Sequence, residues 1–383
     1  MDVYFDNAAS TRVRKEVIEL MVKTMEADYA NPGARHKKGV EAEEYIRQAA
    51  SRIGKCIGAQ PKEILFTSGG TESNNLALTG AARANARQGR HIITSAIEHA
   101  AVYRPLEALQ EEGFELTVLP VDKRGQVSQR ALKEALREDT ILVSIMYVNN
   151  EMGAIEPVDC FGPLIKAANP HTLFHVDAVQ AFGKLPIRVK DWRIDLLSVS
   201  GHKLQGPKGV GFLYAASGVK LAPLLFGGGQ QRGLRSGTLN APGIAGLGLA
   251  GELAYSDLAK TTEEIRNISE CIIKGLSDVE GVYSNSCLEE GVPHILSLRV
   301  EGIPSEVLLH ALEEKGIYVS SGAACSSSHP GISGTLRAIG LREEEAASTI
   351  RLSFSRDTTL EEGEYFLKQF RALLPLLRRF VRR

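Results

Sequence analysis

Between residues 60 and 215, short apolar runs alternate with stretches of helical periodicity. The runs are rich in β-branched and aromatic residues, and their length is typical of buried strands. They read EILFTSG, HIITSAIEH, TILVSIMYVNNE, LFHVDAVQ, DLLSVSGHK and VGFLYA. Strands that alternate with helices in this way predict an α/β domain around a mainly parallel sheet.

Polar residues follow most of these predicted strands. They are Ser68, Glu98, Asn149, Asp177 and Ser200. In an open α/β sheet, ligands bind outside the carboxyl ends of the strands. We therefore expect the functional site to be assembled from the loops that carry these residues.

The pattern changes after a glycine-rich loop at 226–238, where helical periodicity dominates over 244–276. A strand-like HILSLRV, a helix over 304–315, a short strand at IYVSSG and a closing helix rich in Leu and Arg follow, which predicts a compact α+β domain. A chain of 383 residues also exceeds the usual size of a single core. We expect a large domain over 1–255, whose first residues pack with the small domain, and a small domain over 256–383.

Composition narrows the classes of partner. With 43% hydrophobic residues, 24% charged residues and a net charge of −1, nothing favours a nucleic acid or a membrane as a partner. The start, MDVYFDNAAS, has no apolar leader, so we expect a cytoplasmic protein. Five scattered cysteines without a CxxC pair predict neither a disulfide framework nor a structural metal site.

Three weak signals are better explained by structure than by binding. GLGLAG at 246–251 matches a dinucleotide-binding pattern, yet it lies inside an apolar helical run, where small residues allow close packing. The triple glycine at 227–229 lacks the lysine of a nucleotide-binding loop, so we interpret it as a turn. The basic amphipathic tail LLPLLRRFVRR could meet a membrane surface, but such a helix more often packs on its own domain.

Lys203 and Asp177 suggest a specific chemistry. Lys203 lies in SGHKLQGPKG, just past a predicted strand, where glycines let the backbone bend and present the amine to a pocket. A lysine so placed can form a Schiff base with pyridoxal 5'-phosphate (PLP). That cofactor also needs an acid at its pyridine nitrogen, and Asp177 ends another predicted strand.

Short motifs spread from residue 5 to 356 carry a family resemblance. They are FDNAAST, ANPGARH, FTSGGTESNN, IEHAAV, VNNEMG, HVDAVQ, SGHKLQGPKG, GGGQQRGLRSGT, SSGAACSSS and IRLSFSR. Together and in this order they resemble cysteine desulfurases of the NifS/IscS type, in the class V aminotransferase group with PLP fold type I. The resemblance covers essentially the whole chain. It implies a seven-stranded, mainly parallel sheet in the large domain and a homodimer.

The resemblance also assigns the residues around the cofactor. It places Gly70, Thr71, Ser200 and His202 at the phosphate, with Thr238 reaching the phosphate from the neighbouring subunit. A helix that starts near Thr71 would direct N–H groups toward that anion. The resemblance implies that His99 stacks on the pyridine ring and shuttles protons. It places Gln180 at the phenolic oxygen and Asn150 near the cofactor and the substrate carboxylate.

Two further residues are assigned to substrate and sulfur. Arg351 is the candidate for the carboxylate of an amino acid, since a guanidinium can bind it through two hydrogen bonds. Cys325 lies in a stretch of Gly and Ser that predicts a surface loop. The resemblance implies that Cys325 receives sulfur as a persulfide. It also leaves open a transient iron-sulfur contact at this cysteine.

The expected function is therefore removal of sulfur from L-cysteine, giving L-alanine and a Cys325 persulfide. That sulfur would pass to an acceptor protein, such as an iron-sulfur scaffold or a sulfur carrier, for cluster, thio-cofactor or tRNA synthesis. Two alternatives remain open. One is another enzyme of the same fold, such as a selenocysteine lyase, an aminotransferase or a carbon-sulfur lyase. The other is a sulfur-trafficking scaffold without catalysis.

Overall fold

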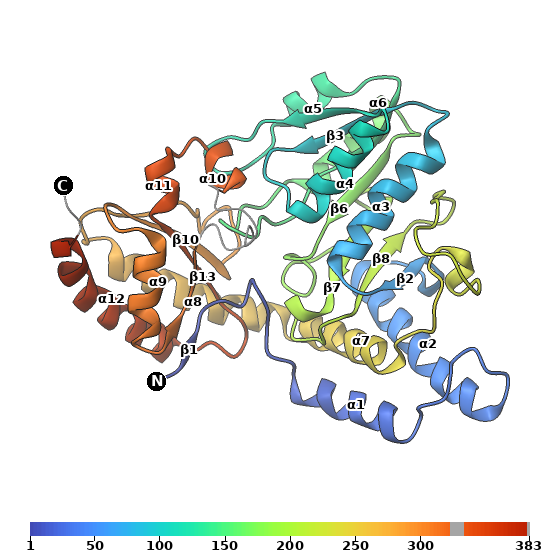
Figure 1. Ribbon diagram of the computed structural model, residues 1–383, viewed down its shortest axis with the longest axis horizontal. Coiled ribbons are helices and arrows are strands. Elements are labelled where there is room, and N and C mark those ends of the chain that lie inside the picture. Colours follow the sequence, from blue (N-terminus) through green and yellow to red (C-terminus); the bar gives the residue numbers. More distant parts are fainter. Residues whose placement is uncertain (322–332, 381–383) are drawn as a thin grey trace.

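The structure of the chain is a computed structural model that describes residues 1–321 and 333–380 (Figure 1). Within these residues the chain forms a seven-stranded sheet, a four-stranded sheet and a two-stranded sheet. None of the described helices is both long enough and apolar enough to cross a membrane.

The seven-stranded sheet forms the centre of the large domain. Its strand order is β2-β8-β7-β6-β5-β3-β4, and β8 runs in the direction opposite to the other six strands. The strands are β2 (Ile64–Thr67), β3 (His91–Ser95), β4 (Glu115–Leu119), β5 (Thr140–Ser144), β6 (Leu173–Asp177), β7 (Leu196–Ser200) and β8 (Gly211–Ala215). This confirms the predicted α/β class with a mainly parallel sheet.

The edge strand β4 was not among the segments that the hydrophobic pattern identified as strands. It lies at the end of the sheet and pairs only with β3 among the described residues. Its burial alternates weakly, and Val118 is exposed. A half-exposed edge strand lacks the continuous apolar run of a central parallel strand, which is why the pattern missed it.

Helices cover both faces of this sheet. Alternate strand residues such as Ile92 and Leu142 pack against α3 and α4, whereas their neighbours Ile93 and Val143 belong to the opposite core. The large-domain helices are α1 (Lys15–Glu26), α2 (Lys37–Ile57), α3 (Gly70–Asn85), α4 (Ala100–Glu111), α5 (Gln129–Ala135), α6 (Val158–Ala168) and α7 (Ala241–Ser256), with 3-10 turns at Pro61–Glu63, Gly201–Lys203 and Gln231–Gly233. The result is a three-layer arrangement.

The GLGLAG stretch lies within α7 and serves packing, as expected. A Cβ atom at Gly246 would approach Met21 and Val17 of α1 to 3.0 and 3.2 Å. A Cβ atom at Gly248 would lie 2.5 Å from the Cα atom of Ala49 on α2. The glycines therefore let α1 and α2 approach α7 closely.

The small domain is a four-stranded antiparallel sheet with helices around it. Its strand order is β12-β13-β10-β9. The first residues pack beside it, because β1 pairs with β11 in a separate two-stranded sheet and Asp6 forms a bridge with Ser353 of β13. The elements are β1 (Val3–Tyr4), α8 (Leu258–Leu276), β9 (Val282–Ser284), β10 (Ile295–Val300), α9 (Ser305–Glu313), β11 (Ile317–Tyr318), β12 (Ser320–Ser321), α10 (Gly334–Ala338), α11 (Glu343–Ala347), β13 (Thr349–Ser353) and α12 (Leu360–Phe380). The basic tail helix α12 packs against α8.

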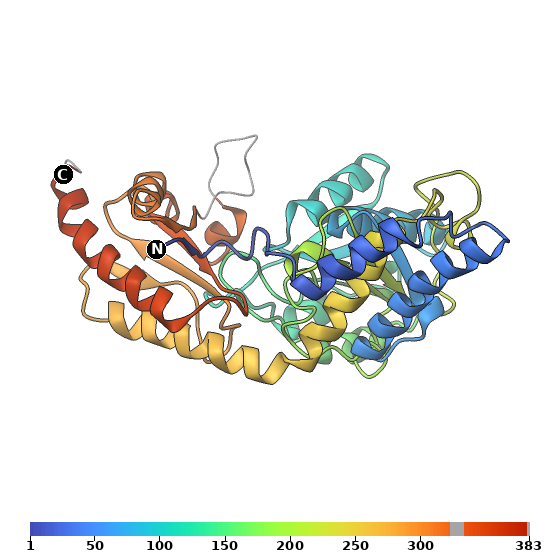
Figure 2. The ribbon, with the colours of Figure 1, turned by 90° about the horizontal axis from the view of Figure 1, so that it is seen from below.

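The helical stretch at 244–276 is not one helix but two. Asp257, with φ of −102° and ψ of 3°, separates α7 from α8. Its carboxylate forms ion pairs with Arg14 and Arg356. The pattern of hydrophobic positions cannot predict such long-range ion pairs. In Figure 2 the two helices run along the base of the molecule from one half to the other. We propose that the domains divide here, close to the expected boundary at 255 and 256.

Candidate active site

A cavity of about 160 Å³ lies at the carboxyl ends of the central strands. It brings together ten of the twelve residues that the sequence singled out. They are Gly70, Thr71, His99, Asn150, Asp177, Gln180, Ser200, His202, Lys203 and Arg351. Nine of these residues lie in the part of the chain that forms the seven-stranded sheet, whereas Arg351 lies on β13 of the four-stranded sheet, so their convergence is a product of the fold.

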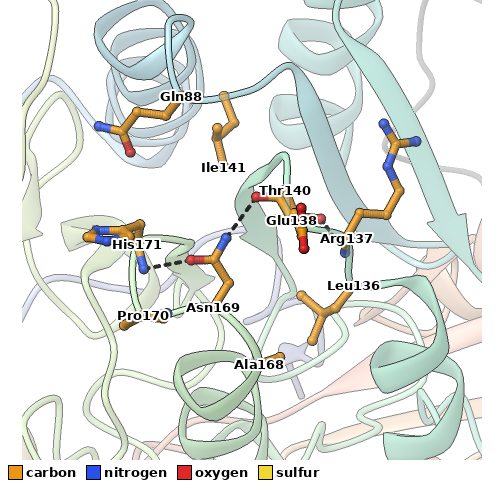
Figure 3. Close-up of a pocket in the computed structure, with 10 residues that line it drawn as sticks. All are labelled: Gln88, Leu136, Arg137, Glu138, Thr140, Ile141, Ala168, Asn169, Pro170 and His171. Atoms are coloured by element: carbon orange, nitrogen blue, oxygen red, sulfur yellow. Dashed lines mark hydrogen bonds between the residues drawn. The ribbon is translucent and has the colours of Figure 1, made fainter.

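A larger hollow of about 630 Å³ opens on another part of the large domain (Figure 3). Its lining comes from the segments before β5 and β6, including Arg137 and Asn169, so it lies at the amino ends of the strands. The Asn169 side chain donates a hydrogen bond to the Glu138 carbonyl at 3.0 Å. Because none of the ten residues lines it, we assign the chemistry to the smaller cavity.

Lys203 sits in a tight turn directly after β7. A Cβ atom at Gly201 would lie 2.8 Å from the Pro207 carbonyl oxygen, so the turn can close only around glycine. The Lys203 Nζ atom donates to the carbonyl oxygens of Ala8 and Ala9 at 2.6 and 2.8 Å. The N-terminal segment therefore holds the amine at the wall of the cavity.

Asp177 ends β6 and is buried. It accepts hydrogen bonds from the Asn74 side chain at 2.7 Å and from the Val179 backbone N–H at 2.9 Å. Asn74 belongs to the motif FTSGGTESNN on α3, but no sequence signal distinguished it from the rest of that motif. Its Oδ1 atom is buried without a partner. The hydrogen bond from Asn74 therefore fixes the orientation of the Asp177 carboxylate.

The first turn of α3 faces the same cavity. A Cβ atom at Gly70 would lie 2.8 Å from Val179 Cγ2, so only glycine fits at this helix start. The early N–H groups of a helix and its dipole favour an anion there. Ser200 and Thr71 add hydroxyl groups to the same region of the cavity.

His202 is the third polar side chain of this region. Its Nδ1 atom lies 3.3 Å from Ser10 Oγ. Burial, together with the charges of nearby lysines, lowers the pKa of His202 to about 4. The ring is therefore neutral near pH 7 and can donate or accept one hydrogen bond without adding a charge.

His99 is the N-cap residue of α4. Its Nδ1 atom accepts a hydrogen bond from the Ala101 backbone N–H at 3.0 Å. A nitrogen that accepts cannot carry the hydrogen, so the neutral ring bears it on Nε2. The helix cap thus determines which ring nitrogen of His99 can donate a proton.

Arg351 lies on β13 and is only 4% exposed. One Nη atom donates to Asp6 Oδ1 at 2.8 Å and the other to the Asn150 carbonyl oxygen at 2.9 Å, whereas its buried Nε atom has no partner. Asp6, in the motif FDNAAST, was not singled out from the sequence. It supplies the counter-charge that a buried guanidinium needs.

Gln180 lies on the turn after β6. Its Nε2 atom donates to the Ala8 carbonyl at 2.9 Å, the same oxygen that accepts from Lys203. Its Oε1 atom accepts from Lys184 Nζ at 3.1 Å. Lys184 was also missed by the sequence analysis. The only signal was its position four residues after Gln180.

The two remaining predicted residues do not line this cavity. Thr238 is exposed, on the glycine-rich loop that Gln231 ties to β2 through two hydrogen bonds with the Phe66 backbone. Its predicted role belongs to a neighbouring subunit and stays a prediction. Cys325 lies outside the described residues. No cluster of three metal-ligating side chains occurs among the residues that the structure describes.

The residues present fit PLP by their chemistry. A primary amine, a buried carboxylate and a helix N-terminus with hydroxyl groups line one cavity, and each matches a different group of that cofactor. The glycine at the helix start and the hydrogen-bonded carboxylate are both built into the backbone packing. A guanidinium at the same cavity adds a place for an amino-acid carboxylate.

Comparison with known proteins agrees with this chemistry. The family model for aminotransferase class-V matches residues 3–366. A protein of Methanosarcina thermophila named cysteine desulfurase IscS is 44% identical over 376 residues, which cover 98% of this chain and 93% of that protein. A solved structure titled NifS-like protein superposes with a TM-score of 0.93 at 40% identity, covering 98% of this chain and 100% of that chain. A structure titled SspA in complex with cysteine gives 0.82 at 36% identity, covering 92% and 99%.

Proposed function

The chain belongs to the class-V aminotransferase family, among the PLP-dependent cysteine desulfurases of the NifS/IscS type, and from this premise we propose how its residues share the reaction. The substrate is L-cysteine, and the products are L-alanine and sulfur bound to the enzyme. One observation carries the assignment of residues. Lys203, Asp177 and Arg351 meet at one cavity, although they lie in different motifs and two domains.

Lys203 would hold the cofactor covalently, and Asp177 would bind its pyridine nitrogen. When bound, PLP accepts the electrons released at the substrate Cα. Gly70, Thr71, Ser200 and His202 hold the phosphate with the α3 N-terminus, and Thr238 of a second copy completes that site. This division is supported by the position of each group around the cavity, with the carboxylate and the helix start both facing it.

The substrate carboxylate binds Arg351, whose buried Nε atom still lacks a partner. Asp6 and the Asn150 carbonyl keep the guanidinium in place while it binds. The Asn150 side chain lies beside the carboxylate, and Gln180 donates to the cofactor's phenolic oxygen. The Lys203 amine, which would also hold PLP, would take the α-proton of the substrate. His99 would stack on the ring of the bound cofactor and would move a proton through Nε2.

Cys325 then attacks the substrate sulfur as a thiolate. A bond forms between the two sulfur atoms, the substrate carbon–sulfur bond breaks, and its electron pair stays on the carbon skeleton, which takes up protons and leaves as alanine. Ser321, four residues before Cys325, lies on β12, where its neighbour Ser320 pairs with Arg351.

The protein acts as a homodimer. Support comes from a stripe of exposed apolar residues on and after α1. It comprises Ile18, Val22, Met25 and Tyr29, and the last is 79% exposed. Phe226, the first residue of the glycine-rich loop, is 85% exposed. Apolar patches of this kind mark surfaces that another protein covers.

The chain works in the cytoplasm and delivers the persulfide sulfur to an acceptor protein, such as an iron-sulfur scaffold or a sulfur carrier. Cytoplasmic placement is supported by the described cysteines Cys56, Cys160, Cys271 and Cys287, all of which are free thiols, as expected in a reducing compartment. A transient iron-sulfur contact at Cys325 during delivery is part of this proposal.

The test follows alanine and protein-bound sulfane sulfur after L-cysteine is added to the PLP-loaded enzyme. The wild type should release alanine and carry labelled sulfur, and Cys325→Ala should lose both. Cys160→Ala removes an exposed thiol elsewhere and serves as the control. Alanine with free sulfide from Cys325→Ala at the wild-type rate would refute the persulfide step in favour of a lyase. A wild type that binds no PLP would instead indicate a scaffold.

A further inference from the structure

A second, smaller cavity of about 60 Å³ adjoins the active site. Lys203 lines both cavities and therefore lies between them. The second cavity is also lined by Lys184 and by His294, which comes from the small domain just before β10. None of the steps described above uses Lys184 or His294.

Lys184 controls the orientation of the Gln180 amide. An ammonium has hydrogen atoms to donate but no lone pair, so the Gln180 atom at 3.1 Å from Nζ must be the oxygen. The Gln180 Nε2 atom is then turned to Ala8, whose carbonyl oxygen also accepts from Lys203. Lys184 therefore sets which end of the Gln180 amide faces the reactive lysine.

His294 offers an acceptor to the same ammonium. It is 4% exposed, it forms a hydrogen bond with the Gln180 backbone, and its Nε2 atom is buried without a partner. Burial, and then the charge of Lys184, keep the pKa of His294 well below its usual range, so the ring is neutral. Both side chains line this cavity of about 60 Å³, which is large enough to hold a water.

We propose that Lys184 is a positioning residue of the PLP site, which holds the Gln180 amide with Nε2 toward Lys203 and places a buried positive charge behind that lysine. His294 supports the charge as a neutral acceptor. The proposal rests on the function above, because it concerns the lysine that carries PLP. It assigns a role to two residues outside the reacting groups.

The charges around Lys184 agree with this role. Burial, followed by the charges of Lys203 and Arg351, lowers the pKa of Lys184 to about 7, so Lys184 carries its positive charge mainly below pH 7 and acts on Lys203 in that range. Repulsion between two ammonium groups is mutual, so Lys184 also disfavours a charge on Lys203. An uncharged amine is the form that bonds to an aldehyde. Two other cations at this cavity, Arg14 and Arg356, are each paired with Asp257 and so contribute less.

The experiment titrates the visible absorption of the bound cofactor with pH, in holoenzyme without substrate. The absorption reports the proton on the nitrogen that Lys203 shares with PLP. Lys184→Met removes a positive charge and should raise the midpoint by about one pH unit, a tenfold change in the proton equilibrium. Lys184→Arg keeps the charge and the donors, and should restore the wild-type midpoint. Lys208→Met, which removes an exposed lysine near His202, should leave it nearly unchanged because solvent screens that charge.

A Lys184→Met midpoint equal to that of the wild type would overturn the proposal. If Lys184→Met fails to fold or to bind PLP, Lys184→Gln is measured in its place, and the same rise is expected because glutamine is also uncharged. A Lys208→Met shift as large as that of Lys184→Met would also overturn it, since any nearby charge would then suffice. A wild type without a cofactor band would overturn the proposed function and this inference together.

Discussion

Glu156 is a buried carboxylic acid that anchors the loop carrying Asn150. It lies directly after the bridge between Val148 and Ile155 that closes this loop. Its side chain is 0% exposed, and the Val127 backbone N–H donates to its two oxygens at 3.2 and 3.0 Å. Burial outweighs this hydrogen bond and raises the pKa of Glu156 from 4.5 to about 8.

This shift makes stability depend on pH. The folded chain holds the Glu156 proton up to about pH 8, whereas the unfolded chain releases it near pH 4.5. The folded state therefore binds more protons between these values, and the free energy of unfolding falls as pH rises through that window. Integrated from pH 5 to pH 8, the loss amounts to about 3 to 4 kcal/mol. Glu156→Gln, which keeps an acceptor for Val127 but has no charge, removes this loss.

Urea denaturation of wild type and Glu156→Gln at pH 5 and pH 8 measures the effect. We expect the variant to gain about 3 to 4 kcal/mol relative to wild type between the two pH values, whichever protein is more stable at pH 5. Glu134→Gln, at an exposed glutamate paired with Arg130, is the control and should show little pH-dependent change. A difference between wild type and Glu156→Gln that does not vary with pH would refute the reasoning.

Three further predictions concern the site and the dimer. Asp177→Asn should fold and bind PLP, because the unpartnered Asn74 oxygen can accept a hydrogen bond from the new amide. The rate of alanine formation should fall on the order of 100-fold, and near-normal turnover would contradict the role of the Asp177 charge. Arg351→Lys should raise KM for L-cysteine roughly 10-fold or more and leave the cofactor absorbance unchanged, since an ammonium cannot reproduce the fixed contacts of the guanidinium. An unchanged KM would mean that the substrate carboxylate binds elsewhere. Val22→Glu should shift the chain toward monomer in sedimentation velocity, because it places a charge on the exposed apolar stripe of α1. A dimer that persists in this variant would show that the interface lies on another surface.

The sequence alone determined the class of fold and the class of chemistry. Central parallel strands are buried on both faces, so they leave continuous apolar runs that can be read directly. The carboxyl ends of such strands meet at one edge, and this predicted that Asp177 and Lys203 would lie near each other. The hydrophobic pattern did not predict the edge strand β4, because one side of that strand is solvated. It also did not predict the break at Asp257, because the break does not interrupt the helical periodicity.

The tertiary structure alone decided the partners of each functional group. Asp6 pairs with Arg351 across 345 residues, and the Ala8 carbonyl receives Lys203 from 195 residues away. Lys184 and His294 meet from different domains at one cavity. Such contacts depend on how the small domain packs against the large one, and no local pattern encodes that arrangement. Residue types and strand ends therefore predict which groups are present, whereas the packing of the two domains determines which of them touch.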